Sequence, residues 1–326
     1  MQNTPDAARR GATPSPAAAA PHVPDVSPDL PPASWRLVLA ALRRLPQGAL
    51  SRAFGRIADV AIPRALRRPV LGTAARVLGI DLAEAERPVE DYPSLNALFV
   101  RRLRPGARRW PQRPDLAGSP VDGVIGAFGQ VRDGRLIQAK GRWYSAADLL
   151  GDPVEGRRYD GGAFLTLYLS PRHYHRIHAP CDGAIPTARY VPGALFPVNT
   201  PAVLHIQDLF ARNERLVCPL DGPLGRVTVV AVGAYNVGRI SAAFDPAWCA
   251  GPGGAHWVTN RRPPAEAVRT YDPPVAVSAG AEIMAFHLGS TVILLFEPGR
   301  ARLAADLRTG AEIRLGDPVA ERAGDA

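Results

Sequence analysis

The spacing of hydrophobic positions changes along the chain and divides it into three regions. Residues 1–34 have no periodicity and are rich in Pro, Ala and Ser, so they bury too little apolar surface to offset the entropy of ordering. Residues 35–90 carry apolar side chains at helical spacing. From 91 to 326, apolar runs of about five to eight residues alternate with Gly, Pro and Asp, which is typical of strands and turns. The pattern predicts a disordered tail, a helical segment and a β-rich domain.

The helical segment is predicted to contain amphipathic helices with a basic face. The apolar rows are Trp35, Val38, Leu39, Leu42 and Leu45; then Leu50, Phe54, Ile57, Ala58 and Ala61; then Leu66, Leu71, Ala75 and Leu78 within a helix near Arg64–Leu78. Residues 35–79 hold nine Arg and one acid, Asp59, an excess of +8 against +9 for the whole chain. Such helices suit an anionic membrane surface. The alternative is helices packed on the core with a solvated Arg face.

Within residues 91–326, helical periodicity is confined to Tyr92–Leu103 and a short turn at Ser145–Leu150. The remaining segments, among them AFLTLYLS, GRVTVVAV and STVILLF, are predicted to be strands. We therefore expect an α+β fold, with a mainly antiparallel β core preceded by short amphipathic helices.

Composition narrows the chemistry available. Lys140 is the only lysine among 326 residues, so an internal aldimine with pyridoxal phosphate would have to use it. The three cysteines, Cys181, Cys218 and Cys249, are far apart and form no CxxC pair, which favours neither a disulfide framework nor a zinc knuckle. No apolar run is long enough to span a bilayer, and the N-terminus lacks the apolar stretch of a secretory signal. No nucleic-acid recognition motif accompanies the basic charge.

A Gly-Ser pair interrupts the apolar pattern near the C-terminus, in AEIMAFHLGSTVILLFEPG. Gly289 and Ser290 lie between two apolar runs, and the second run reads as a buried strand. One interpretation is a bulge or tight bend with a buried hydroxyl. The other is a hydroxyl nucleophile held at the end of a sheet.

Histidines and one aspartate could serve such a nucleophile. PRHYHRIHAP contains His173, His175 and His178 within six residues, and at least one of them suits a general acid or base. An H-x-H metal pair is an alternative, but no further ligand stands at a suggestive spacing, so we predict no metal site. Asp122 in SPVDG is either an ordinary Asp-Gly turn or the partner that orients a histidine toward Ser290. The G-x-S-x-G pattern of serine hydrolases is absent.

These segments, in this order, resemble the pyruvoyl-dependent phosphatidylserine decarboxylase proenzymes of bacteria. The resemblance spans most of residues 92–316 and rests on YPSLNALFVRRLRPGAR, SPVDGVIGAFGQV, IQAKGRWYSAADLLG, YLSPRHYHRIHAP, YVPGALFPVN, LFARNERLV, VGAYNVGRI and LGSTVILLFEPG. One departure is His173, where relatives often carry an acid, so the resemblance implies no acidic role at this position.

The resemblance implies a self-cleaving enzyme. Asp122, His178 and Ser290 match the self-cleavage triad, and cleavage between Gly289 and Ser290 would divide the chain into residues 1–289 and 290–326. Ser290 would become a pyruvoyl group, a self-derived cofactor that forms a Schiff base with the serine amine of the substrate. His175 matches the second histidine of the family and is the candidate proton donor.

The implied reaction converts phosphatidylserine to phosphatidylethanolamine, in a heterodimer of the two chains without nucleic acid. Residues 35–90 would associate with an anionic membrane, so the expected location is the cytoplasmic side of the cell membrane, peripherally bound. In YVPGALFPVN, the apolar side chains of Tyr190, Leu195 and Phe196 are candidates for substrate binding; a packed surface loop is the alternative. Two other functions stay open: a pyruvoyl decarboxylase for a related serine phospholipid or a soluble amino acid, and a self-cleaving membrane adaptor without decarboxylase activity.

Overall fold

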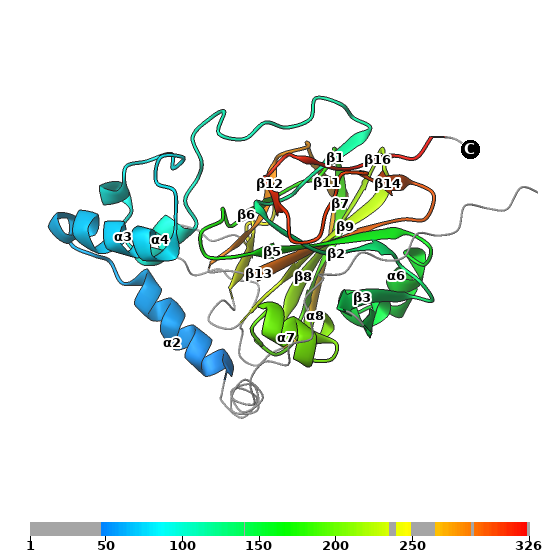
Figure 1. The fold of residues 1–326 in the computed structure, drawn as a ribbon, viewed down its shortest axis with the longest axis horizontal. Helices are drawn as coiled ribbons and strands as arrows, with labels where there is room; N and C mark the ends of the chain where they lie inside the picture. The colour runs from blue at the N-terminus through cyan, green and yellow to red at the C-terminus, as the bar shows by residue number, and fades with distance from the viewer. Residues whose placement is uncertain (1–46, 140, 235–238, 249–264, 288–289, 325–326) are drawn as a thin grey trace, which may run out of the picture.

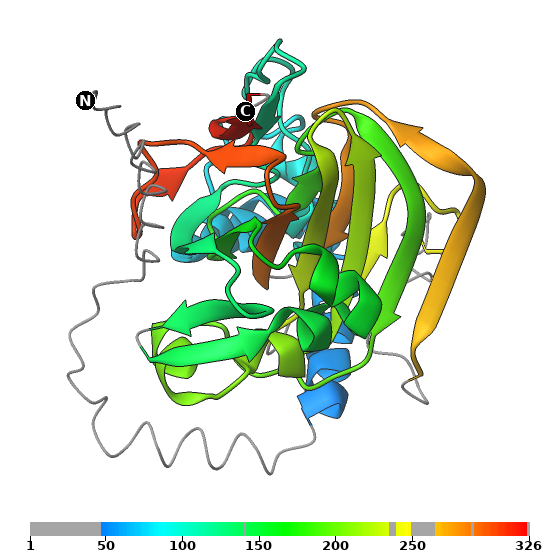
Figure 2. The ribbon, with the colours of Figure 1, turned by 90° about the vertical axis from the view of Figure 1, so that its right-hand side faces the viewer.

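The computed structural model describes residues 47–139, 141–234, 239–248, 265–287 and 290–324. An eight-stranded sheet dominates this part of the chain (Figure 1). In spatial order its strands are β11 (Ala267–Val277), β7 (Gly183–Val191), β8 (Arg215–Gly222), β9 (Gly225–Val232), β13 (Ser290–Phe296), β5 (Ala163–Leu169), β2 (Gly123–Gln130) and β15 (Glu312–Ile313). Each neighbouring pair is antiparallel, which confirms the predicted sheet type. Figure 2 shows β11, in orange, at the outer edge of this sheet.

Three smaller sheets complete the β structure of the described residues, and all three are also antiparallel. Their strands are β1 (Leu116–Gly118), β16 (Pro318–Arg322) and β14 (Ala301–Leu303); β10 (Ile240–Ala242), β12 (Glu282–Phe286) and β6 (Arg176–His178); and β3 (Arg135–Ala139) with β4 (Arg142–Ser145).

The helices are short. They are α2 (Gln47–Asp59), α3 (Arg64–Leu78), the 3₁₀ turn η1 (Val89–Asp91), α4 (Leu95–Phe99), α5 (Ala146–Leu150), α6 (Pro153–Arg158), α7 (Thr200–His205) and α8 (Leu209–Arg212). The second and third predicted helical patterns correspond to α2 and α3. The first, with Trp35, Leu39 and Leu42, lies outside the described residues, as does the predicted tail at 1–34. No described helix has the length and apolar character needed to cross a bilayer.

The helix predicted at Tyr92–Leu103 is shorter than expected. It begins after Ser94, whose hydroxyl accepts the Ala97 N–H at 3.2 Å, and it ends at Phe99. Beyond this point Leu103 forms an antiparallel bridge with Ala85, and this extended pairing replaces the last turns of the expected helix. The predicted turn at Ser145–Leu150 is present as α5, capped by the Ser145 hydroxyl.

Both faces of the large sheet are covered, and β13 lies at its centre. Val292, Leu294 and Phe296 pack in a cluster with the two three-stranded sheets, while Ile293 and Leu295 pack on the opposite side with the helices and the β3–β4 hairpin. Since both sides of β13 are buried, its sequence is a continuous apolar run rather than an alternating one. Cys181 and Cys218 are free and buried, and Cys249 lies outside the described residues.

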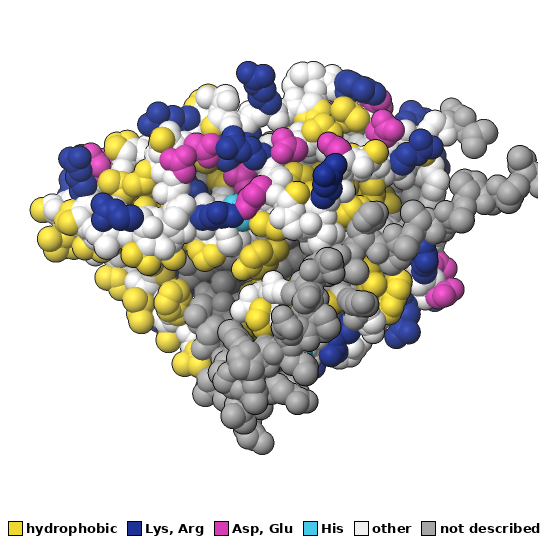
Figure 3. All heavy atoms as spheres, in the orientation of Figure 1, with side chains coloured by type: hydrophobic (Ala, Val, Ile, Leu, Met, Phe, Trp, Pro, Cys, Tyr) yellow, Lys and Arg dark blue, Asp and Glu magenta, His cyan; other side chains and the backbone are white. Residues whose placement is uncertain are grey.

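Helix α2 exposes its larger apolar side chains. Phe54 is 38% exposed and Ile57 69% exposed, whereas Ser51, Gly55 and Ala58 face the rest of the protein. Helix α3 adds further exposed apolar side chains, namely Leu66, Val70 and Val77. Figure 3 shows hydrophobic side chains gathered at the left-hand end of the molecule, where α2 and α3 lie in Figure 1, with Arg side chains beside them. We call the exposed side chains of Leu50, Phe54, Ile57, Val60, Leu66, Val70 and Val77 the apolar face.

Candidate functional site

The candidate site lies at the end of the large sheet where β13 begins. Ser290 pairs with Leu169, the last residue of β5, and Val124 near the start of β2 pairs with Tyr168. Because these strands are antiparallel neighbours, the start of β13, the end of β5 and the start of β2 meet at one end of the sheet. Asp122 and the histidine-rich segment that follows β5 are therefore brought to the same end as Ser290. Leu288, Gly289 and the Ser290 side chain lie outside what the structure describes.

Asp122 is buried and bound to an arginine. Its two carboxylate oxygens accept hydrogen bonds from Arg108 at 2.8 and 2.5 Å, and one also accepts the Leu315 N–H at 2.8 Å. Arg108 also donates to Glu84 at 2.8 and 3.0 Å. Its hydrogen bonds to Asp122, the largest influence, raise the pKa of Arg108 above its usual value. The carboxylate of Asp122 is therefore held as one part of an ionic network.

His178 is held in one tautomer by a backbone carbonyl. Its Nδ1 donates to the Gly280 oxygen at 2.7 Å, so Nε2 is left as an acceptor, and the Tyr174 hydroxyl lies 3.2 Å from it. Burial lowers the pKa of His178, which favours this neutral form. Among the described residues no hydrogen bond joins His178 to Asp122. The two are near each other through shared neighbours, since Arg108 and Leu315 line a pocket of about 370 Å³ with His178.

His175 is fully buried against the Phe99 ring, with the two ring centroids 4.0 Å apart. Its Nδ1 donates to the His173 carbonyl at 2.8 Å, and its Nε2 has no hydrogen-bond partner among the described residues. Burial lowers the pKa of His175 to about 3. His175 is thus neutral, and its Nε2 presents a lone pair rather than a proton.

His173 contacts the C-terminal part of the chain. Its Nδ1 accepts the Ser170 N–H at 3.0 Å, so Nε2 carries the proton and donates to Glu312 of β15 at 3.1 Å. Glu312 also forms an ion pair with Arg172. At the position where the family pattern often has an acid, this chain has a histidine, and Glu312 supplies the acid beside it. The imidazole rings of His173 and His175 thus have different hydrogen-bond partners, and the described residues hold no cluster of three side chains suited to a metal ion.

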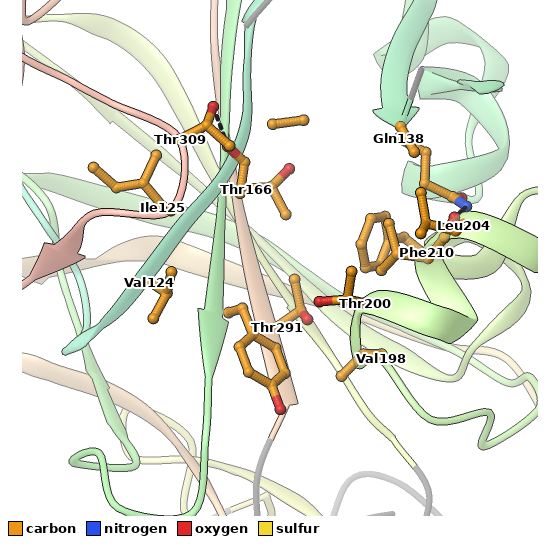
Figure 4. Close-up of a pocket in the computed structure, with 16 residues that line it drawn as sticks. Val124, Ile125, Gln138, Thr166, Val198, Thr200, Leu204, Phe210, Thr291 and Thr309 are labelled. Carbon is orange, nitrogen blue, oxygen red and sulfur yellow. Dashed lines mark hydrogen bonds between the residues drawn. The ribbon is translucent and has the colours of Figure 1, made fainter. Parts of the chain in front are cut away.

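A second pocket, of about 380 Å³, adjoins the start of β13 (Figure 4). Val198, Thr200 and Phe210 line it from the side of α7 and α8, and Ile125 and Thr309 line the other side. Thr291 and Tyr168 also line it, and the buried Thr291 hydroxyl has no hydrogen-bond partner among the described residues. The pocket is mostly apolar, and Thr291, which lines it, directly follows Ser290 in the chain.

The three candidate substrate-binding residues are buried and line neither pocket. Tyr190 lies on β7, where its hydroxyl donates to Glu214 at 3.2 Å. Phe196 is fixed by the Asn213 side chain, which bonds both its N–H and its carbonyl, and the neighbouring Leu195 is buried. The segment YVPGALFPVN reaches the 380 Å³ pocket through Val198 instead.

Sequence reasoning gave no role to Arg108, Tyr174 or Thr291. Arg108 and Tyr174 belong to motifs that carried the family resemblance, FVRRLRPGAR and YLSPRHYHRIHAP, but nothing local indicates their partners. Thr291 could have been singled out from the strand period, because consecutive residues of β13 point to opposite sides of the sheet.

The buried histidines predict a loss of stability in acid. His287, bonded through Nε2 to the Ser241 hydroxyl at 3.0 Å, resembles His175 in that burial lowers its pKa to about 3. Unfolding releases both side chains to pKa values near 6.5, so the unfolded chain takes up protons first. Stability should be complete above about pH 6.5 and fall by about 1.4 kcal/mol per pH unit for each histidine between pH 6.5 and 3. Urea midpoints of the Ser290→Ala chain at pH 7 and pH 5 measure this loss; equal midpoints would contradict it.

Comparisons with known proteins all match this chain to phosphatidylserine decarboxylases. The family model described as phosphatidylserine decarboxylase matches residues 95–321. The phosphatidylserine decarboxylase proenzyme of Anaeromyxobacter sp. (strain K) is 46% identical over 284 residues, covering 87% of this chain and 98% of the relative. The proenzyme of Myxococcus xanthus (strain DK1622) is 40% identical over 84% of this chain and 94% of its own length. That of Brevibacillus brevis is 37% identical over 88% of this chain and 98% of its own length.

Proposed function

The chain belongs to the phosphatidylserine decarboxylase family, and from this premise we infer that it is an enzyme that decarboxylates phosphatidylserine to phosphatidylethanolamine. The observation that carries the inference is the 46% identity over nearly the whole length of a relative that bears this name. The relatives are proenzymes, and this chain has Gly289-Ser290 directly before its central strand. We propose that the chain cuts itself at that bond.

Cleavage begins when the Ser290 hydroxyl attacks the carbonyl carbon of Gly289 and the amide is exchanged for an ester. Elimination then releases Gly289 as a carboxylate, and hydrolysis of the dehydroalanine at 290 with loss of ammonia leaves a pyruvoyl group. The position suits such a group, because residue 290 is the first residue of the buried strand β13 and directly precedes Thr291, which lines an apolar pocket. A ketone there supplies the electron sink that decarboxylation of an amino acid requires, the role that pyridoxal phosphate has in other enzymes.

We propose His178 as the base that removes the Ser290 hydroxyl proton. Its support is the tautomer, since Nε2 carries no proton and, among the described residues, its one hydrogen-bond partner is the Tyr174 hydroxyl. Asp122 would act through the charge it keeps beside Arg108, because Arg108 and the Leu315 N–H take both of its oxygens. His175 is the candidate proton donor, and its Nε2 must first take up a proton before it can give one.

We assign the 380 Å³ pocket to the substrate. Thr291 lines it directly after Ser290, and its walls are largely apolar, which suits the glycerol and acyl parts of a phospholipid. Tyr190, Leu195 and Phe196 would shape this region from behind, since the same segment reaches the pocket at Val198.

The two chains should remain associated after cleavage without a disulfide. Residues 290–326 provide β13, which pairs with β5 and β9 of the other chain. Glu297 bonds Arg158 at 3.0 Å and the Arg226 N–H at 2.8 Å, so polar contacts supplement the buried strand. This arrangement supports the proposal of a heterodimer.

Intact-mass measurement of the purified protein tests the proposed function. We expect chains of residues 1–289 and 290–326, the second beginning with a pyruvoyl group, together with release of phosphatidylethanolamine from phosphatidylserine. Active material with only a full-length chain would contradict self-cleavage. A cut chain that begins with an ordinary Ser290 and releases no ethanolamine lipid would indicate the adaptor instead.

We further propose that the enzyme binds the surface of an anionic membrane, at its cytoplasmic side, through the apolar face of α2 and α3. The support is the exposure of these large side chains, since contiguous apolar patches are uncommon on monomeric proteins unless they bind something. The Arg residues of the same segment add attraction to anionic headgroups. Arg36, Arg43 and Arg44 would contribute to it and lie outside the described residues.

Removing two side chains of the apolar face tests this contact. Phe54→Ser with Ile57→Ser should weaken co-sedimentation with anionic vesicles by tenfold or more at every salt concentration, because burying each side chain is worth about 1.5–3 kcal/mol and salt does not screen it. Val154→Ser is the matched control, because Val154 on α6 is 68% exposed, almost as much as Ile57. Self-cleavage should persist in both variants. Unchanged vesicle binding by the double variant would exclude this face.

A further inference from the structure

The inward face of α2 holds an arginine from a distant part of the chain. Arg239 immediately precedes β10, and its side chain is only 10% exposed. It forms an ion pair with Asp59, the last residue of α2. Asp59 also accepts a hydrogen bond from Asn96 of α4 at 2.8 Å, so one carboxylate joins three segments.

Gly55, one turn before Asp59, makes room for this guanidinium. A Cβ atom added at Gly55 would lie 2.3 Å from Nη2 and 2.5 Å from Cζ of Arg239. Real contacts of this kind are never so short, so the guanidinium packs directly on the helix backbone at a position where any larger side chain would displace it. Gly55 and Asp59 together form a seat for Arg239.

The backbone at Arg239 is hydrogen-bonded to the segment that precedes the proposed cleavage bond. Its carbonyl accepts the His287 N–H at 3.0 Å, and the next residue, Ile240, pairs with Phe286. Ser241 then bonds the His287 ring at 3.0 Å. His287 is buried and lies two residues before Gly289. Strand β10 therefore holds β12 and His287, the segment that leads to the proposed cleavage bond.

The outer side of α2 carries two of the side chains that we propose to contact the membrane. Phe54 and Ile57 are exposed, while Gly55 and Asp59 contact Arg239. One helix, thirteen residues long, therefore connects the apolar face to the strand that precedes Ser290.

We propose that Arg239 is a positioning residue, and that its seat on Gly55 and Asp59 of α2 holds β10 and His287 in the arrangement that self-cleavage at Gly289–Ser290 requires. The proposal rests on the proposed function of the Gly289–Ser290 bond. If Asp59 loses its charge, the guanidinium loses this ion pair, and if Gly55 gains a side chain, the guanidinium is pushed out of its place on α2. Removing the opposite charge of an ion pair from a side chain that is only 10% exposed is unfavourable, so Arg239 moves toward water and draws the start of β10 with it. His287, which the Arg239 carbonyl and the Ser241 hydroxyl hold, then shifts relative to the scissile bond.

The test measures the rate at which the chain of residues 290–326 appears in freshly made protein, by intact mass. Gly55→Val should slow cleavage by tenfold or more, and Asp59→Asn, which keeps the side-chain volume, by several-fold. Gly72→Val is the matched control, because a Cβ at Gly72 of α3 meets no atom within 4 Å. Vesicle binding should be retained in both α2 variants, since Phe54 and Ile57 are unchanged.

A double-mutant cycle separates positioning from a general loss of structure. If Asp59 and Arg239 act through one contact, Asp59→Asn combined with Arg239→Met should be no slower than the slower single variant. Multiplied effects, or cleavage of Gly55→Val and Asp59→Asn within twofold of Gly72→Val, would overturn the proposal. If Gly55→Val does not fold, Asp59→Asn and the cycle decide alone. Absence of cleavage in the wild-type chain would instead refute the proposed function, so the two failures are distinguishable.

Discussion

Ser290→Ala should leave the chain whole and abolish decarboxylation. Alanine has no hydroxyl to attack the Gly289 carbonyl, so no ester forms, the backbone is not cut and residue 290 never acquires a ketone. The fold should persist, because β13 contributes its buried side chains from Thr291 onward. Intact mass should give a single chain, and phosphatidylethanolamine release should fall to the background of the assay.

The neighbouring hydroxyl provides the control for cleavage. Thr291→Val removes an oxygen that has no hydrogen-bond partner among the described residues, in a side chain of nearly the same shape. Losing an unpaired buried hydroxyl costs little or is favourable. This variant should be cut at the rate of the wild-type chain. Cleavage of Ser290→Ala at the same bond would remove Ser290 from the chemistry altogether.

His178→Ala and Asp122→Asn should each block or greatly slow cleavage, for different reasons. Without the imidazole the Ser290 hydroxyl has no positioned base, a loss of roughly 10²–10⁴-fold in rate. Asparagine at 122 keeps the shape but removes the charge, and its amide group cannot accept the second hydrogen bond from Arg108. The rate of appearance of residues 290–326 measures both effects.

A further substitution shows how Asp122 acts. If Arg108 is its essential partner, Arg108→Lys should slow cleavage as well, because lysine cannot reproduce the paired hydrogen bonds of a guanidinium. Asp115→Asn is the matched control, since Asp115 binds Arg113 through both oxygens on the exposed surface. It should cleave normally. A wild-type rate for either His178→Ala or Asp122→Asn would refute the triad. A wild-type rate for Arg108→Lys would instead indicate that Asp122 acts by direct contact with His178.

The hydrophobic pattern predicted several of the main elements, but it missed the short helices α6, α7 and α8, because within residues 91–326 it indicated helix only at Tyr92–Leu103 and Ser145–Leu150. The run after Ser290 becomes the central strand β13, and the second and third helical rows become α2 and α3. For the apolar row of α2 it left two interpretations open, contact with a membrane or packing on the core. In α2 small residues face inward and Phe54 and Ile57 face outward, because the space beside α2 is taken by the Arg239 guanidinium.

The candidate site shows the same division. Sequence motifs brought Asp122, the histidines and Ser290 into one hypothesis, and the strand register brings their segments to one end of the sheet. The hydrogen-bond partners were beyond prediction. Asp122 pairs with Arg108, and His178 with Gly280 and Tyr174, through side-chain geometry that depends on loops between strands. Residue type alone does not determine which of several arginines or carbonyls will be nearest.

The central position of β13 in the sheet determines the order of folding and self-cleavage. Strand β13 has to pair with β5 and β9 before the Gly289–Ser290 bond is held in position for cleavage. Folding therefore has to precede maturation. Once the bond is broken, residues 290–326 are no longer tethered to the strands that recruited them, and closing the sheet again becomes a bimolecular event. Refolding of the mature protein should therefore depend on its concentration, whereas refolding of the uncut chain should not.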